Sequence, residues 1–129
     1  MQIHQSAEDY LETILMLSQR MGKVRSIDVV NELGFTKASV SIAMNKLREN
    51  GYIAVDGEGN LTLLEPGREI AERIYSRHQL LTHFFVQLGV DEQTAAEDAC
   101  KAEHILSEQT LEKIRESALR NDAAHPQAK

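Results

Sequence analysis

The chain has 129 residues, of which 42% are hydrophobic and 26% are charged, and its formal net charge at pH 7 is −6. These values predict one compact unit or two small subdomains with a shared core. No stretch approaches the roughly 18 apolar residues of a membrane span, and the N-terminus lacks a signal-peptide pattern, so no membrane partner is expected. A single cysteine excludes an internal disulfide framework, and the expected location is a reducing cytoplasm.

Charge is unevenly distributed along the chain. The segment from Arg20 to Arg48 holds six basic residues and two acidic ones, which gives it a local net charge of +4. An acidic body argues against indiscriminate binding of nucleic acid. One locally basic segment nevertheless fits a protein that meets DNA with a single surface.

The first half of the chain predicts three helices followed by a β-hairpin. A capping box opens the first helix, and a turn of about three residues joins the second and third, as in a helix-turn-helix. Glycine, aspartate and asparagine between the two strands are typical of a hairpin loop. The expected elements are helices from Ser6 to Gly22, from Ser26 to Gly34 and from Thr36, which caps it, to Gly51, and strands at 52–55 and 61–64. The fold class is therefore mainly α, beginning with a winged helix-turn-helix over residues 1–65.

The second half predicts a helical domain over residues 66–120. Pro66 opens a long helix that Gly89 ends. Asp91 is expected to cap a fifth helix that runs to about Leu106, and Ser107 a sixth that runs to about Leu119. These helices carry more apolar surface than one small hairpin could cover, so we expect them to form a homodimer. Residues 121–129 are small and polar, which predicts a disordered tail.

Side chains off the apolar stripe of the third helix are candidates for contact with double-stranded DNA. Small hydroxyl groups near a helix N-terminus can approach phosphates and base edges, asparagine can pair with adenine, and lysine and arginine can bind phosphates. The candidates are Arg25, Thr36, Lys37, Ser39, Ser41, Ile42, Asn45 and Lys46. Two other interpretations stay open, because these could be ordinary solvated residues and because winged helices also bind proteins.

The stretch Cys100-Lys-Ala-Glu103-His104 places a thiolate, a carboxylate and an imidazole at positions i, i+3 and i+4. On a helix these side chains share one face. Sulfur, oxygen and nitrogen donors together indicate a first-row transition metal rather than calcium or a structural zinc finger. The spacing alone also allows a small core cysteine beside a solvated glutamate and an ordinary histidine.

Beside a winged helix, these residues resemble the DtxR/MntR family of iron- and manganese-dependent transcriptional repressors. The resemblance covers residues 6–120 and depends on several separate motifs. They are Ser6-Ala-Glu-Asp-Tyr-Leu-Glu12, Leu-Arg-Glu-Asn-Gly-Tyr-Ile at 47–53, Arg77-His78, and Glu103-His104-Ile-Leu-Ser107. The SH3-like third domain of the family has no counterpart here, so we expect the shorter MntR-type architecture.

The resemblance implies a metal site and a mechanism. Its ligands would be Asp9, Glu12, His78, Cys100, Glu103 and His104, holding one or two ions per subunit. Iron-type relatives carry a cysteine at the position of Cys100, whereas manganese-type relatives carry a carboxylate there. Iron-type relatives have a methionine at the position of Asp9, so this donor set is a hybrid. Thiolate favours Fe²⁺, with Mn²⁺ close behind, and Co²⁺, Ni²⁺ or Zn²⁺ would also bind in vitro.

The expected function is metal-dependent repression of metal-homeostasis genes through a palindromic operator, with the ion as corepressor. One alternative is a metal-independent winged-helix regulator that senses an organic ligand or, through Cys100, redox state. An enzyme is not expected, because the sequence supplies no substrate cleft, oxyanion hole or additional base.

Overall fold

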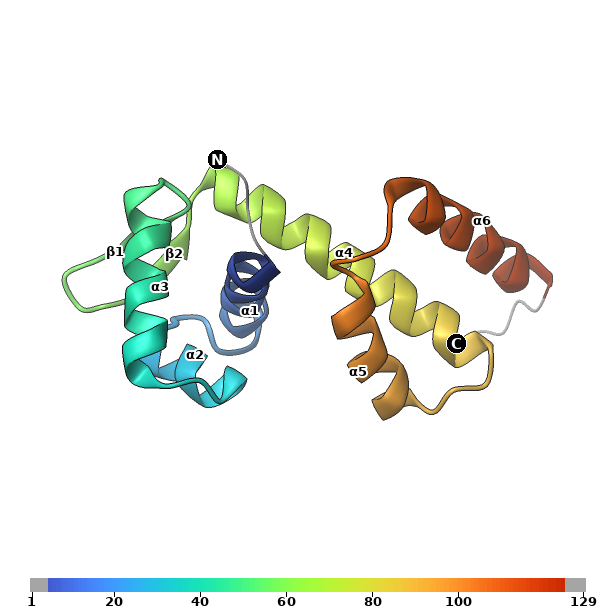
Figure 1. Ribbon diagram of the computed structural model, residues 1–129, viewed down its shortest axis with the longest axis horizontal. Helices are drawn as coiled ribbons and strands as arrows, with labels where there is room; N and C mark the ends of the chain where they lie inside the picture. Colours follow the sequence, from blue (N-terminus) through green and yellow to red (C-terminus); the bar gives the residue numbers. More distant parts are fainter. Residues whose placement is uncertain (1–4, 125–129) are drawn as a thin grey trace. The chain divides into compact units, whose positions relative to one another are not determined.

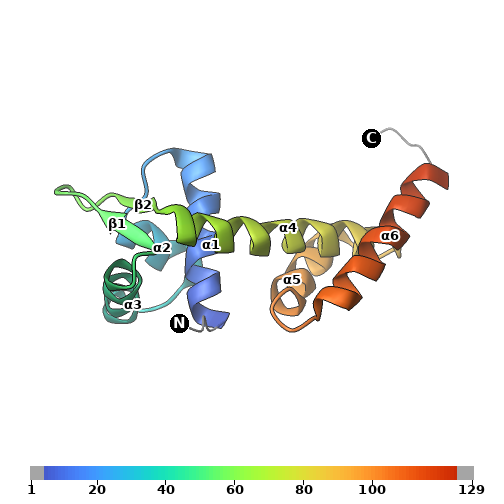
Figure 2. The same ribbon diagram turned by 90° about the horizontal axis from the view of Figure 1, so that it is seen from above.

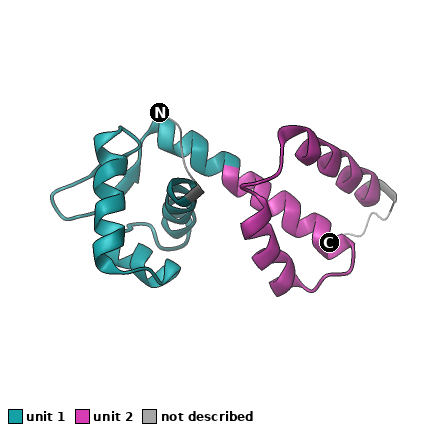
Figure 3. Cartoon of the chain, viewed as in Figure 1, with its two compact units in different colours: residues 1–73 teal, residues 74–129 magenta. Residues whose placement is uncertain are grey.

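The computed structural model describes residues 5–124 of the chain, and these form helices with one small sheet (Figures 1 and 2). The elements in order are α1 (Gln5–Met21), α2 (Ser26–Leu33), α3 (Lys37–Glu49), β1 (Ile53–Val55), β2 (Leu61–Leu63), α4 (Glu65–Gln87), α5 (Glu92–Ala102) and α6 (Glu108–Ala124). The chain divides into unit 1, Met1–Arg73, and unit 2, Ile74–Lys129 (Figure 3). None of the described helices is long and apolar enough to cross a membrane.

Unit 1 is a winged helix-turn-helix, as predicted. The α2 helix ends at Leu33 and is followed by its C-cap residue Gly34, which adopts a left-handed conformation at φ 75°. The α3 helix begins after Thr36, whose Oγ1 accepts a hydrogen bond from the Ser39 backbone N–H at 3.1 Å. The two strands pair antiparallel, with Ile53 opposite Leu63. The shared core contains Leu11, Ile14, Val24, Val29, Val40, Met44, Leu47, Ile53, Leu61 and Leu63.

Unit 2 contains the later part of α4 together with α5 and α6. Leu81, Ala99 and Leu111, one from each helix, form the centre of its core. Both predicted caps are present: Asp91 accepts from the Thr94 backbone N–H at 3.1 Å, and Ser107 accepts from the Thr110 backbone N–H at 3.1 Å. Unit 2 is therefore a three-helix assembly in which a cap side chain marks the start of α5 and of α6.

Two helix boundaries of unit 2 differ from the prediction. The α5 helix ends at Ala102 rather than near Leu106, because the Ile105 backbone N–H donates to the Ala102 carbonyl in a tight turn at 3.1 Å. The α6 helix continues to Ala124, through residues that the sequence assigned to the tail. Asp122 is held there, since Gln87 Nε2 donates to its Oδ1 at 2.8 Å. Residues 125–129 of the expected tail lie outside the described residues.

Gly67 on the first turns of α4 lies against the backbone of Tyr52. A Cβ at this position would collide with the Tyr52 carbonyl oxygen and lie 3.0 Å from the carbonyl carbon. The same carbonyl accepts a hydrogen bond from the Leu64 backbone N–H at 3.0 Å, so it cannot easily move away. Close approach of two backbone segments, rather than an unusual φ angle, therefore requires glycine here.

We expect Gly67→Ala to destabilise the protein by about 1–3 kcal/mol through overpacking, although alanine favours helices by about 1 kcal/mol. Urea denaturation at fixed protein concentration measures the effect. Gly57→Ala is the matched control, because a Cβ there meets nothing within 4 Å. Equal denaturation midpoints for Gly67→Ala and the parent chain would contradict the packing argument.

The wing loop between β1 and β2 is organised by the Asp56 carboxylate. Asp56 Oδ1 accepts from the backbone N–H groups of Glu58 and Asn60, each at 2.9 Å, and Oδ2 accepts from Asn60 Nδ2 at 3.0 Å. These bonds hold the pKa of Asp56 below its ordinary value of 3.8, with the Asn60 backbone N–H as the largest cause. The ionised carboxylate is thus the form that the folded loop favours.

Because the pKa of Asp56 is lower in the folded state, its contribution to stability is present at neutral pH and is lost as pH falls through that lowered pKa. An NMR titration of the Asp56 carboxyl carbon should therefore give a midpoint below 3.8. Asn60→Ala removes the side-chain donor but keeps the backbone donor, and should move the midpoint part of the way back. An Asp56 midpoint at the ordinary value in the parent chain would refute this account of the loop.

Candidate metal centre and DNA-binding surface

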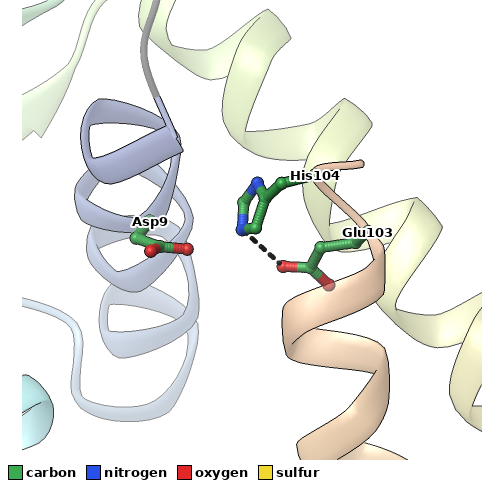
Figure 4. A group of neighbouring side chains, drawn as sticks. All are labelled: Asp9, Glu103 and His104. Atoms are coloured by element: carbon green, nitrogen blue, oxygen red, sulfur yellow. Dashed lines mark ion pairs between the residues drawn. The ribbon is translucent and has the colours of Figure 1, made fainter. Parts of the chain in front are cut away.

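The carboxylate of Glu103 is fully buried, with 0% of the residue exposed. Glu103 caps the C-terminus of α5 and keeps helical backbone angles, φ −61° and ψ −20°. Its Oε1 lies 3.0 Å from His78 Nδ1 on α4, and its Oε2 lies 3.5 Å from His104 Nε2. Figure 4 shows the Glu103 carboxylate facing the His104 ring. Unit 2 alone therefore brings three predicted ligands together.

Both imidazoles beside Glu103 are largely shielded from solvent. The His104 side chain is 1% exposed and that of His78 is 20% exposed. A buried carboxylate is costly unless hydrogen-bond donors or positive charge compensate for its lost hydration. Among the residues that the structure describes, Glu103 Oε2 accepts no hydrogen bond. A carboxylate oxygen facing an imidazole nitrogen in a buried place is a donor set that fits a first-row divalent metal.

Cys100 differs from its neighbours in burial. It lies on the last turn of α5, three residues before Glu103, and its side chain is exposed. The predicted helical spacing holds as far as Glu103, whereas His104 follows the end of the helix. The Cys100 side chain is thus exposed, while the Glu103 carboxylate and the two imidazoles are largely shielded from solvent.

The two remaining predicted ligands, Asp9 and Glu12, belong to unit 1. They are one turn apart on α1 and so share a face of that helix. Glu12 is 5% exposed, and Asp9 is half-buried and also drawn in Figure 4. Burial in the core raises the pKa of Tyr10, which lies between them, and the Asp9 carboxylate raises it further. The first helix therefore presents two carboxylates beside the hydrophobic core of unit 1.

One residue of this region was not predicted to have a role. Arg77 precedes His78 on α4, and its Nη1 donates to the backbone carbonyl of Glu103 at 3.2 Å. In the sequence it forms part of the Arg77-His78 motif, but 26 residues separate it from Glu103. Local spacing gives no signal for a contact of that kind.

The predicted DNA-contacting side chains of α3 all point away from the core. Val40, Met44 and Leu47 form the buried stripe of this helix. Ile42, in the middle of the other face, is 59% exposed. The remaining exposed candidates are Thr36, Lys37, Ser39, Ser41, Asn45 and Lys46 on or next to α3, and Arg25 before α2. The structure thus leaves a polar surface with lysines at both ends of α3.

Comparison with known proteins identifies both halves of the chain. Residues 2–61 match the iron dependent repressor N-terminal DNA binding domain, and residues 64–126 match the iron dependent repressor metal binding and dimerisation domain. An uncharacterized HTH-type transcriptional regulator of Methanocaldococcus jannaschii is 36% identical over 86% of this chain and 90% of its own length. The HTH-type transcriptional regulator MntR of Lysinibacillus sphaericus is 33% identical over 84% of this chain and 78% of its own length.

Solved structures agree with these relatives. The structure of a manganese-dependent transcriptional repressor in complex with manganese superposes with a TM-score of 0.79, at 28% identity, over 87% of this chain and 52% of the other. The present chain thus spans about half the length of several of the solved structures that it matches. The matched families and relatives are transcriptional regulators rather than enzymes. The chain belongs to the DtxR/MntR family of metal-dependent transcriptional repressors.

Proposed function

We propose that this chain is a cytoplasmic metal sensor that represses metal-homeostasis genes, binding a palindromic operator as a homodimer with Fe²⁺ or Mn²⁺ as corepressor. The observation that carries the proposal is the fully buried carboxylate of Glu103, placed between the imidazoles of His78 and His104. Family membership disfavours the metal-independent regulator considered from the sequence.

In this proposal six side chains hold one or two ions per subunit. The ion, when bound, supplies the positive charge that lets several carboxylates lie together in a buried place. Glu103 and His104 are already buried in the structure, and Glu12 is a nearly buried carboxylate on α1. The proposed ligands are Asp9, Glu12, His78, Cys100, Glu103 and His104.

The mechanism follows from how these ligands are divided between the units. Asp9 and Glu12 belong to the unit that carries α3, whereas the other four belong to unit 2. Ligands from both units on the same ion would restrict the units to one arrangement. In a two-fold dimer that arrangement sets the separation of the two α3 helices, which must match the spacing of the operator half-sites. Metal then favours the DNA-competent state by population shift.

On the DNA, the exposed face of α3 would provide the contacts. Lys37, Lys46 and Arg25 would bind phosphates and so make binding depend on salt concentration. Asn45 is suited to adenine and Ile42 to a thymine methyl group, because these side chains match the edges of those bases in the major groove. The hydroxyl groups of Thr36, Ser39 and Ser41 lie near the N-terminus of α3, where phosphates are favoured.

For the physiological metal we favour Fe²⁺, with Mn²⁺ close behind. The thiolate of Cys100 prefers the softer ion, while Asp9, Glu12 and Glu103 supply the hard oxygens that suit Mn²⁺. A repressor structure similar to this chain contains manganese. Co²⁺ and Ni²⁺ would also bind in vitro, because affinity for such donors generally rises from Mn²⁺ to Cu²⁺, and so would Zn²⁺, which accepts the same sulfur, nitrogen and oxygen ligands.

Fluorescence anisotropy with the DNA upstream of the protein's own gene tests the corepressor role. Under anaerobic conditions we expect tight binding only when Fe²⁺ or Mn²⁺ is present, and none with a chelator. Glu103→Ala and His104→Ala should lose this metal stimulation while remaining folded dimers. Glu97→Ala is the matched control, because Glu97 is an exposed residue of the same helix. Normal metal-stimulated binding in both ligand variants, or equal binding with chelator, would refute the proposal.

Substitution at Cys100 tests the choice of metal. We expect Cys100→Asp to shift the preference from Fe²⁺ toward Mn²⁺ by on the order of tenfold or more, since a hard oxygen replaces a soft sulfur. The measurement is the ratio of the Fe²⁺ and Mn²⁺ concentrations that give half-maximal DNA binding. Cys100→Ser serves as a control that removes the thiolate without adding charge, and it should weaken Fe²⁺ more than Mn²⁺. An unchanged ratio in both variants would show that Cys100 does not select the metal.

A further inference from the structure

Arg77 is a largely buried arginine on the part of α4 that belongs to unit 2, directly before His78. Its side chain is 15% exposed. A guanidinium shielded to this extent has lost much of its hydration, and it is stable only where its N–H groups meet acceptors. The acceptors of Arg77 therefore indicate its role.

The two ends of the Arg77 guanidinium bind two different elements. Nη1 donates to the backbone carbonyl of Glu103 at 3.2 Å, and Nη2 forms an ion pair with the carboxylate of Glu108. Glu103 caps the end of α5, and Glu108 is the first residue of α6. The planar guanidinium has its donors in fixed directions. One side chain thus ties together the end of α5 and the start of α6, on both sides of the connection between them.

Glu103 is consequently held at two points by consecutive residues of α4. Arg77 binds its backbone carbonyl, and His78 Nδ1 lies 3.0 Å from its carboxylate. Binding of the carbonyl limits rotation of the peptide that links Glu103 to His104. The contact therefore acts on the positions of two proposed ligands without involving a ligand atom.

We propose that Arg77 is a positioning residue, which orders the turn carrying Glu103 and His104 before a divalent metal binds. This inference depends on the metal function proposed above. Ligands that are already ordered do not lose further conformational freedom on binding, so the affinity for metal rises. The Glu108 carboxylate neutralises the guanidinium, which would otherwise repel an incoming cation.

The test uses the full-length chain and Mn²⁺ alone, with unbound Mn²⁺ measured by electron paramagnetic resonance. We expect Arg77→Met to weaken Mn²⁺ binding by about 10- to 100-fold, the range known for residues that support metal ligands. Arg77→Lys should lose part of this affinity, because an ammonium group cannot reach both acceptors in the same geometry. Arg115→Met is the matched control: Arg115 pairs with Glu112 at 2.8 Å on α6 and is 44% exposed. Its affinity should equal that of the parent.

Glu108→Gln supplies a second, independent variant. It should also weaken Mn²⁺ binding, and the double variant Arg77→Met/Glu108→Gln should lose much less than the sum of the two single losses, because the two residues form one pair. Hydrogen exchange of the metal-free protein adds a readout without metal. Amides of residues 103–106 should exchange faster in Arg77→Met, while those of α3 remain as protected as in the parent.

Two failures of the experiment are distinct. A parent chain that binds neither Mn²⁺ nor Fe²⁺ would overturn the proposed function together with this inference. A parent that binds Mn²⁺, with equal affinity in a folded Arg77→Met variant, would overturn the positioning role alone. Should Arg77→Met fail to fold, Arg77→Lys and Glu108→Gln decide, and parent-like Mn²⁺ affinity in both would overturn it.

Discussion

The buried carboxylate of Glu103 is the constraint on which the rest of unit 2 depends. Its two oxygens lie 3.0 Å from His78 Nδ1 and 3.5 Å from His104 Nε2, and its carbonyl accepts from Arg77 at 3.2 Å. A core of similar volume made of apolar side chains would avoid the cost of removing these polar groups from water. A site that accepts such a cost is typical of function rather than of stability. The end of α5 and the start of α6 are placed so that the buried Glu103 carboxylate keeps these contacts.

In unit 1, the α3 helix has one face in the core and one face on the surface. Val40, Met44 and Leu47 are buried, so the helix is fixed by one stripe, and the other face is not needed for folding. Ile42 lies in the middle of that face and is 59% exposed, so it has no packing role in the core of unit 1. Because the chain as a whole is acidic, with a net charge of −6, attraction to DNA has to come from this local surface. Specific contacts therefore matter more here than in a uniformly basic protein.

Sequence reasoning succeeded where local chemistry decides the structure. Thr36, Asp91 and Ser107 cap helices as predicted, because a side-chain oxygen satisfies backbone N–H groups within a few residues. It failed at the end of α5, where a tight turn between Ala102 and Ile105 replaces the last expected turn of the helix. Two contacts between distant residues also had no signal in the sequence. Gly67 lies against Tyr52, 15 positions away, and Arg77 donates a hydrogen bond to Glu103, 26 positions away. Spacing along one helix carries no information about such pairs.

Burial divides the proposed ligands into two kinds. Glu103 and the side chain of His104 are shielded from solvent. Cys100 is exposed on the last turn of α5, where substitutions usually change stability by no more than about 0.5 kcal/mol. The donor at this position can therefore change between sulfur and oxygen while the buried ligands and the fold remain the same. In the proposed function, Glu103 and the imidazoles would bind the ion, and residue 100 would adjust which ion is preferred. A hybrid donor set fits this division of roles.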